Sequence, residues 1–251
     1  MTEISELGDI FADLGRSDSA NIAYGMWIDG ERYFVKGVRR GRAGSDAAVG
    51  ELRNAVRVAR RVSHPAMPQL EQVLASTTGP ILVYRWVDGD LLGVRGLAHW
   101  RFRELPATDV LSALDTIYEV QALLAADGWI AVDFYDGSLI YDFATGRVSV
   151  IDFDLYRCGP FVNEMGRMYG SSRFMAPEEF ELGAGIDQRT TVFVLGRTAL
   201  VFLSDGTLQR HEFRGSDGLY DVVSRACRPD PVDRAPTVAD FHAAWLAARI
   251  G

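Results

Sequence analysis

One lysine and several aspartates occupy positions where short apolar runs of the chain end. Lys36 ends one strand-like run and Asp152 follows another, while Asp133 and Asp136 lie in a polar stretch that ends at Ser138. Carboxylate oxygens are preferred ligands of hard divalent cations, and a lysine offsets the negative charge of phosphate groups. These residue types point to chemistry on a phosphate that carries a metal ion. Taken alone, each position is also compatible with an ordinary polar turn or a solvent-facing lysine.

The order of four motifs resembles that of the protein-kinase-like superfamily. Phe-Val-Lys at 34–36 is similar to the strand that carries the kinase lysine, and the stretch 132–140 resembles the catalytic loop. Asp-Phe-Asp at 152–154 looks like the DFG motif with aspartate in place of glycine. Gly-Ser-Ser-Arg-Phe-Met-Ala-Pro-Glu at 170–178 resembles the end of an activation segment. The ordered set spans most of the chain and predicts a kinase-like fold.

The resemblance implies catalytic and metal-binding roles for individual residues. Lys36 would neutralise the phosphates of ATP, Asp133 would orient the acceptor hydroxyl and take its proton, and Asp152 would hold Mg²⁺. Ser138 stands where kinases carry an asparagine that ligates magnesium. Because a hydroxyl is a poorer ligand for this hard cation, Asp136 is expected to compensate as a metal ligand.

The resemblance also implies contacts with the nucleotide. Glu51 is the candidate acid for an ion pair with Lys36, although the usual position of this acid is occupied by Ala55, one helical turn later. The backbone of Arg85 and Val87 would meet the edge of the adenine. These assignments rest on the alignment of motifs alone.

The glycine-rich phosphate loop of protein kinases is absent in its usual form. Ser17 and Ser19 stand in its place, ahead of the first strand of a hairpin. Their hydroxyls would meet the phosphates where glycines normally let backbone N–H groups approach. The pattern of these serines with Asn21 is similar to that of aminoglycoside and choline phosphotransferases. A simple polar turn is the plainer interpretation.

Other positions concern the support of the catalytic loop. Ala131 and Val132 replace the His-Arg of protein kinases, whose arginine couples the loop to a phosphorylated activation segment, so activation by that route is not expected. Thr191 stands in place of the helix aspartate that anchors the loop. Glu178 and Arg234, by contrast, match the residues that form a buried ion pair in the family. Truncating one partner of such a pair should cost on the order of 3–5 kcal/mol.

Composition limits the partners and the compartment. The net charge of −8 argues against a nucleic-acid partner, which usually needs a basic face. Cys158 and Cys227 are far apart and have no partner at metal-ligand spacing, so a reducing, cytoplasmic location is expected. The first residues have acids where a signal peptide needs bases. The most apolar helical run, residues 191–203, is too short and too polar to span a bilayer, so no membrane contact is expected. The oligomeric state stays open.

The candidate residues must be positioned by an α+β fold, and the pattern favours two lobes. An Asp-Gly pair between alternating runs predicts a hairpin. The expected strands are 22–28, 32–38, 70–75 and 80–87, with short strands within 129–154, and the expected helices are 46–63, 109–126, 190–203, 219–225 and 238–249. We expect a small β-rich lobe, residues 1–87, and a larger helical lobe, residues 88–251. Such an order favours nucleotide binding in the cleft between lobes.

Three functions are compatible with this resemblance. The first is transfer of the γ-phosphate of ATP to a hydroxyl, most simply Ser or Thr of a protein, because the segment at 170–178 docks the peptide in protein kinases. The second is a kinase for a small-molecule hydroxyl, favoured by the Ser-rich stretch and by Tyr135 in place of a catalytic-loop lysine. The third is a pseudokinase that acts as a binding module, favoured by Ser138, Ala131 and Asp154. Retention of the lysine and the two central aspartates argues against the third.

Overall fold

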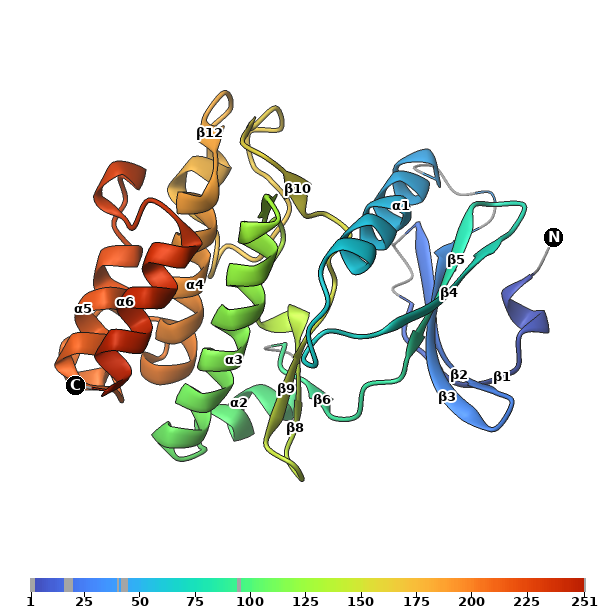
Figure 1. Ribbon diagram of the computed structural model, residues 1–251, viewed down its shortest axis with the longest axis horizontal. Helices are drawn as coiled ribbons and strands as arrows, with labels where there is room; N and C mark the ends of the chain where they lie inside the picture. Colours follow the sequence, from blue (N-terminus) through green and yellow to red (C-terminus); the bar gives the residue numbers. More distant parts are fainter. Residues whose placement is uncertain (1–2, 16–19, 40, 42–44, 94–95, 251) are drawn as a thin grey trace. The chain divides into compact units, whose positions relative to one another are not determined.

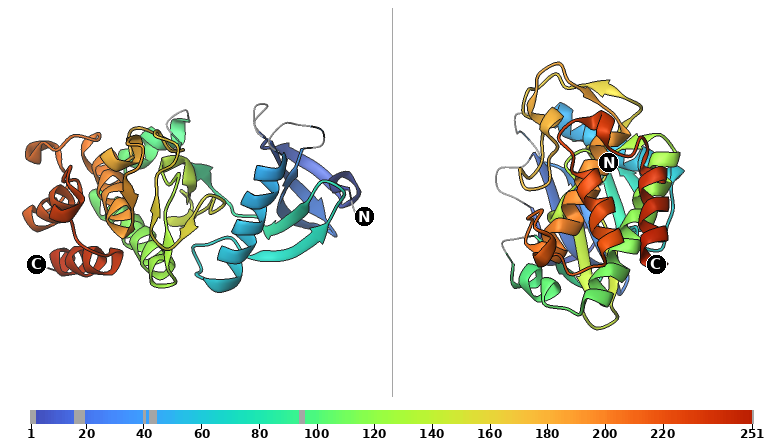
Figure 2. Two further views of the ribbon diagram at one scale, coloured as in Figure 1. Left: turned by 90° about the horizontal axis from the view of Figure 1, so that it is seen from above. Right: turned by 90° about the vertical axis from the view of Figure 1, so that its left-hand side faces the viewer.

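The computed structural model describes residues 3–15, 20–39, 41, 45–93 and 96–250. The chain divides into two compact units, one of Met1–Asp88 with Asp152–Leu155 and one of Gly89–Ile151 with Tyr156–Gly251. Helices and strands occur in both, so the predicted α+β class is confirmed (Figure 1, Figure 2). The first unit ends one residue beyond the predicted division after residue 87. It also contains the stretch 152–155, which the sequence analysis assigned to the second half of the chain.

The first unit is a five-stranded antiparallel sheet with a helix on one face (Figure 1). The strand order is β1-β2-β3-β5-β4. The strands are β1 (Asp9–Asp13), β2 (Asn21–Ile28), β3 (Glu31–Val38), β4 (Leu70–Ala75) and β5 (Pro80–Arg85), and the helix is α1 (Ser45–Arg61). Helix α1 ends before the His-Pro pair at 64–65, as expected from the restriction that proline places on the preceding residue.

Strands β2 and β3 form the predicted hairpin. Asp29 and Gly30 connect them with φ angles of 51° and 83°, and positive values at both central residues are what a type I′ turn requires. The register pairs Gly25 with Phe34. Because side chains alternate along a strand and cross-strand partners share a face, Phe34 and Lys36 project from the same face as Gly25 would.

Helix α1 packs on the face of the sheet that carries Lys36. Leu52 and Ala55 of the helix are buried against Val38 and Leu82 of the sheet. Val38 follows Lys36 by two residues, so both lie on this face. The opposite face has a core of its own, formed by Met26, Val35, Ile81 and Val83 and covered in part by Ile4 and Leu7.

The second unit is mainly helical (Figure 1). Its helices within the described residues are α2 (Leu97–Arg103), α3 (Ala107–Ala126), α4 (Gln188–Ser204), α5 (Asp217–Ala226) and α6 (Val238–Ile250). Strands β6 (Asp90–Leu91), β8 (Leu139–Asp142) and β9 (Arg147–Val150) form a small sheet, β7 (Trp129–Ile130) pairs with β10 (Arg157–Cys158), and β11 (Phe161–Val162) pairs with β12 (Gly185–Ile186). Helices α3, α4, α5 and α6 pack against one another and form the core of this unit.

Strands β1, β6, β10, β11 and β12 and helix α2 were not predicted from the sequence, whereas β7 lies within the stretch 129–154 where short strands were expected. Strand β1 is exposed at four of its five positions, so it lacks the alternating apolar pattern that marks the other strands. Helix α2 is a short helix in which only His99 and Phe102 are buried. In the described part of the chain, no helix combines the length and the apolar character that a bilayer span requires.

Candidate active site

Lys36 is enclosed by two aspartates of the segment that resembles the DFG motif. Its Nζ lies 3.3 Å from Oδ1 of Asp152 and pairs more closely with Oδ2 of Asp154. The side chain of Asp154 is 11% exposed, whereas that of Asp152 is 44% exposed. The tighter ion pair is therefore the buried one, and Asp152 keeps a carboxylate that solvent or a ligand can reach.

These three charges stabilise one another within the first unit. Burial by itself lowers the pKa of Lys36, but the carboxylates of Asp154 and Asp152 outweigh burial and raise the pKa of the ammonium above its usual value. Burial raises the pKa of the Asp154 carboxyl to about 6, while the charge of Lys36 opposes this rise. At neutral pH the lysine is a partly buried cation, which is the state that phosphate oxygens require.

Asn54 of helix α1 fixes the backbone of the same segment. Its Nδ2 donates to the carbonyl oxygen of Asp154 at 2.9 Å, and its Oδ1 accepts from Nη2 of Arg57 at 2.8 Å. Asn54 is itself buried. The side chain of one helix residue therefore holds Asp154 beside Lys36, although these residues are far apart in the sequence.

The position of Glu51 differs from the prediction. Its Oε2 accepts a hydrogen bond from Nδ2 of Asn21 at 3.1 Å, whereas the ion pairs of Lys36 go to Asp152 and Asp154. A pairing of Glu51 with Lys36 is therefore not what this structure contains. The physical reason lies in helix α1, where the acid stands one turn too early. Ala55, at the usual position of the acid, is part of the apolar core.

The residues predicted to meet the nucleotide base lie at and beyond the end of β5. The backbone N–H of Arg85 donates to the carbonyl of Gln69 at 2.9 Å, and its guanidinium Nε donates to Glu71 at 2.7 Å. Val87 follows in an irregular stretch before Gly89. The N–H of Arg85 is thus already used, and these positions remain predictions for the base. Ser17 and Ser19, predicted to meet the phosphates, lie outside the described residues.

An aromatic cluster lies beside Gly25, on the face that carries Lys36. The rings of Phe11 and Trp86 meet edge to face, with centroids 4.9 Å apart. A Cβ on Gly25 would lie 2.6 Å from Phe11 and 2.9 Å from Trp86. The absence of a side chain at position 25 lets both rings approach the backbone of β2. The sheet therefore presents an apolar surface next to the charged cluster.

Asp133 and Asp152 share an uncommon backbone conformation. Their φ angles are 59° and 68°. Among the described residues that are not glycine, the others with positive φ are Asp29, in the hairpin turn, and Asp205, which caps the end of α4. Those two have a local structural reason. Asp133 and Asp152 lie at neither a hairpin turn nor a helix end. Sparsely populated backbone conformations such as theirs concentrate at functional sites.

The loop around Asp133 is supported from helix α4 and from within. Thr191 of α4 accepts a hydrogen bond on Oγ1 from the N–H of Ala131 at 3.1 Å, so its hydroxyl does anchor the loop. Ser138 donates from Oγ to the carbonyl of Asp133 at 3.3 Å and accepts from the N–H of Tyr135 at 3.4 Å. Ser138 is fully buried. This burial disagrees with its predicted role as a magnesium ligand, because a hydrated ion must reach its ligands.

Asp136 also differs from its predicted role. Its side chain is fully buried, and Oδ2 lies 2.5 Å from Nη2 of Arg173 and 3.2 Å from Nδ1 of His99. A carboxylate enclosed in this way is committed to an internal ion pair. The prediction that Asp136 compensates for Ser138 as a metal ligand therefore has no support in this geometry.

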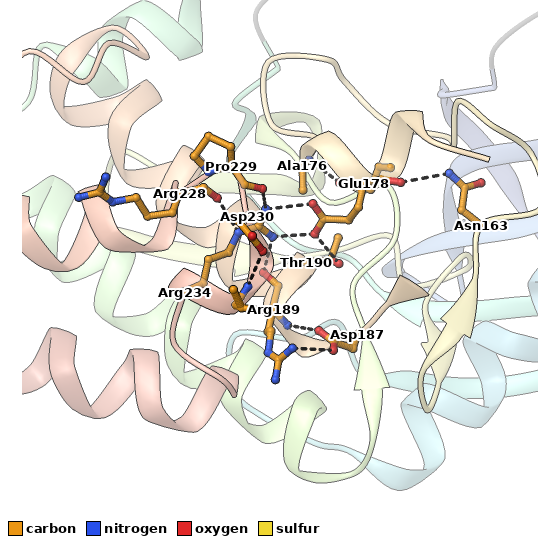
Figure 3. Close-up of polar contacts among 12 residues, drawn as sticks. Asn163, Ala176, Glu178, Asp187, Arg189, Thr190, Arg228, Pro229, Asp230 and Arg234 are labelled. Carbon is orange, nitrogen blue, oxygen red and sulfur yellow. Dashed lines mark hydrogen bonds and ion pairs between the residues drawn. The ribbon is translucent and has the colours of Figure 1, made fainter. Parts of the chain in front are cut away.

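Glu178 and Arg234 form the ion pair expected from the motif (Figure 3). Nη1 and Nη2 of the arginine donate to the two carboxylate oxygens at 2.6 Å and 2.9 Å. The remaining donors reach backbone oxygens of Arg189, Arg228 and Pro229 at 2.8–3.1 Å. All five guanidinium N–H groups are satisfied, which is the condition for burying this charge. The pair fixes the end of the segment 170–178.

Two further contacts attach Glu178 to its surroundings (Figure 3). The hydroxyl of Thr190 donates to Oε1 at 2.8 Å, and Nδ2 of Asn163 donates to the backbone carbonyl at 3.3 Å. The first contact joins the segment to helix α4, and the second joins it to the residue that follows β11. The end of the segment is therefore a well-bonded structural element.

Glu179 is a buried acid in the neighbourhood of Asp133. Both residues line one narrow space, too small to hold a water molecule, together with Tyr169, Gly170 and Met175. Oε2 of Glu179 accepts from the N–H of Ala176 at 2.7 Å, and the residue is 2% exposed. Burial raises the pKa of Glu179 to about 8, and the negative charges of Glu178 and Asp133 add to the rise.

Sequence reasoning missed four residues that build this site. Asn54, Arg173, Glu179 and His99 each make a contact described above, but none belongs to a position that the motif resemblance marks as functional. A usable signal existed for Asn54, a polar residue that lies between core positions of α1. Arg173 and His99 gave no such signal, because their shared partner, Asp136, comes from another segment.

Comparisons with known proteins add no relative. The chain matches no model of a known protein family, and none of the curated proteins matches it. Within the part of the chain that the structure describes, no three or more His, Cys, Asp or Glu side chains form a group that could hold a metal ion. The function must be argued from the residues themselves.

Proposed function

We propose that the protein is an ATP- and Mg²⁺-dependent phosphotransferase with a kinase-like fold, which moves the γ-phosphate to a hydroxyl, most simply that of Ser or Thr in a protein. The observation that carries the proposal is the cluster of Lys36, Asp152 and Asp154. It combines a partly buried cation with one accessible carboxylate. Along the chain, Lys36, Asp133, Asp152 and the Glu178–Arg234 pair follow one another in the order that protein kinases have.

In this proposal each residue has a defined task. Lys36 offsets the charge of the phosphates, and Asp133 orients the acceptor hydroxyl and accepts its proton. Asp152 holds the magnesium ion, which when bound withdraws charge from the phosphate oxygens. Catalysis of this type depends mainly on positioning and charge stabilisation, so a site with few reactive groups is sufficient.

The residues present fit a magnesium ion that has few protein ligands. Asp152 offers an accessible carboxylate, and Mg²⁺ commonly uses one or two carboxylates together with phosphate oxygens and water. The burial of Ser138 and Asp136 leaves Asp152 as the main protein ligand in the proposal. The affinity for magnesium should therefore depend strongly on bound nucleotide.

The fixed end of segment 170–178 favours a protein acceptor. Its end is tied down by Glu178, Arg234 and Thr190, so it presents a fixed surface next to the loop of Asp133. A peptide that is to be phosphorylated needs such a fixed platform, because misplacement of the hydroxyl by 1 Å can cost about 100-fold in rate.

A second candidate is a nucleotide-binding module without transferase activity. The observation in its favour is that Lys36 already has a close carboxylate partner in Asp154, so phosphate must compete for it. The loss of magnesium ligands at Ser138 and Asp136 also favours a module that binds nucleotide without transferring phosphate. This candidate predicts nucleotide binding with no phosphate transfer.

The deciding experiment follows the γ-phosphate. Purified protein is incubated with γ-labelled ATP and Mg²⁺, alone and with the protein and small-molecule fractions of a cell extract. Asp133→Asn is the inactive control, and Asp46→Asn, an exposed change in α1, is the matched active control. Label in protein that depends on Asp133 supports the proposal. Label only in small molecules would replace the acceptor class, and ATP binding without transfer would favour the binding module.

A further inference from the structure

Arg173 and Asp136 form an ion pair that neither the motifs nor the proposed reaction accounts for. Asp136 is fully buried, and its Oδ2 lies 2.5 Å from Nη2 of Arg173 and 3.2 Å from Nδ1 of His99. The other oxygen, Oδ1, is buried and has no hydrogen-bond partner among the described residues. A buried carboxylate with so few partners is costly without a cation. Arg173 supplies the cation that pairs with this buried carboxylate.

The two residues belong to different segments of the second unit. Asp136 lies three residues after Asp133, in the loop that Ser138 closes by its bond to the Asp133 carbonyl. Arg173 lies in the segment 170–178, whose far end is fixed by Glu178. The ion pair therefore joins the loop of the proposed catalytic base to the segment proposed to dock the acceptor.

Arg173 is also held at its backbone. Nε of Arg197, on helix α4, donates to the carbonyl of Arg173 at 2.8 Å, and Nη1 of Arg197 donates to Gly206 at 2.8 Å. His99 in turn lies 3.1 Å from the carbonyl of Leu92 through Nδ1. The ion pair is thus part of a network that reaches helices α2 and α4. It is more than a surface contact between two mobile side chains.

The positive and negative partners of this contact lie on the opposite segments from those in protein kinases. In protein kinases an arginine of the catalytic loop contacts a phosphate on the activation segment. Val132 stands in place of that arginine in this chain. In this chain the loop supplies the acid and the segment supplies the arginine. No phosphate is needed to complete the pair.

We propose that the Arg173–Asp136 ion pair holds the segment 170–178 against the loop of Asp133 in its working arrangement without phosphorylation of the chain, with Arg173 as the positioning residue. This inference rests on the proposed phosphotransferase function. It predicts that the unmodified protein is as active as any modified form. It also predicts that loss of Arg173 affects the use of the acceptor more than the use of ATP.

The test compares Arg173→Met with Arg249→Met. Arg249 is a matched control, because it is similarly exposed and pairs with Asp115, between helices α6 and α3. Amide hydrogen exchange of residues 168–176 is measured first. Arg173→Met should accelerate this exchange by roughly 10-fold or more, the amount expected from loss of a charged hydrogen bond, and Arg249→Met should not. Unchanged exchange in Arg173→Met would overturn the proposal, whether or not the protein transfers phosphate.

Kinetics then separate positioning from stability. Arg173→Met should raise the KM for the acceptor by roughly 10-fold with little change in the KM for ATP, and Arg173→Lys should restore part of the loss. The double variant Asp136→Asn/Arg173→Met removes both charges, so it should recover the stability lost in Arg173→Met but keep the fast exchange and the high acceptor KM. If the double variant regained both the slow exchange and the low acceptor KM of the wild type, the ion pair would have only a structural role.

Phosphatase treatment completes the test. Protein shown by mass measurement to carry no phosphate should retain its activity. Loss of transfer on removal of phosphate would overturn the proposal. Absence of transfer from every preparation, together with the predicted exchange difference, would refute the phosphotransferase function and leave the positioning of the segment intact.

Discussion

Lys36 forms its closest ion pair with the carboxylate of Asp154. The sequence predicts Glu51 as its partner, but Glu51 accepts a hydrogen bond from Asn21 instead. Both Lys36 and Asp154 are largely buried, and Asn54 holds the backbone of Asp154 in place. Asp154, the third residue of the DFG-like motif, is therefore the close carboxylate partner of Lys36. Ala55, one turn after Glu51, lies in the apolar core instead.

Asp154→Asn should therefore impair the proposed reaction more than Glu51→Gln. Loss of a charged partner of a buried lysine corresponds to about 1.5–3 kcal/mol, so kcat/KM for ATP should fall by about 10- to 100-fold. Glu51→Gln keeps an acceptor for Asn21 and should leave kcat/KM within about threefold of the wild type. Steady-state kinetics of the two variants check this. A larger loss in Glu51→Gln would return that residue to the site.

Asp152→Asn should abolish the effect of magnesium on nucleotide affinity. In the proposed reaction the accessible carboxylate is the main protein ligand for the ion, and an amide oxygen carries no charge to offset that of the ion. Calorimetric titration with ATP, with and without Mg²⁺, should show at least about tenfold tighter binding with the ion in the wild type and no difference in Asp152→Asn. Asp46→Asn serves as the control and should resemble the wild type. Equal magnesium dependence in both variants would remove Asp152 from the metal site.

The parts of the fold that could be predicted are those that local pattern determines. The Asp29-Gly30 turn, helix α1 and the long apolar helices each follow from residue types within one short stretch. The Glu178–Arg234 pair was also predictable, because two distant motifs of known order name both partners. Strand β1, with an exposed pattern, carried no such signal.

The errors at the site have a common physical cause. Which cation a buried carboxylate meets depends on packing between segments, and spacing along the chain does not reveal it. Asp136 looks like a metal ligand in the sequence, but Arg173 and His99 enclose it in the folded unit. Glu51 looks like the partner of Lys36, but Asp154 is closer. The types of charge were predictable, and the pairs were not.

Arg234→Met should destabilise the second unit strongly. The change leaves the carboxylate of Glu178 buried without its cation, and the expected loss is on the order of 3–5 kcal/mol in the free energy of unfolding. Urea unfolding followed by circular dichroism measures it. The double variant Glu178→Gln/Arg234→Met removes the unpaired charge and should recover a large part of the loss. A loss below about 1 kcal/mol in the single variant would contradict the structural role assigned to this pair.

Glu179 should make the stability of the protein depend on pH above the range where ordinary carboxyl groups titrate. Burial raises the pKa of this group from 4.5 to about 8 in the folded protein. Between these values the unfolded chain has released a proton that the folded chain keeps. The contribution of Glu179 to stability is therefore fully present below pH 4.5, declines as the pH rises, and is lost above about pH 8.

Glu179→Gln isolates this effect, because an amide oxygen can still accept from the N–H of Ala176 but has no proton to release. The difference in unfolding free energy between wild type and variant should shift against the wild type by on the order of 4 kcal/mol from pH 4.5 to pH 8. Urea titrations at several pH values measure the shift, with Glu181→Gln, an exposed neighbour, as control. A difference that stays constant with pH would mean that Glu179 is ionised in the folded protein.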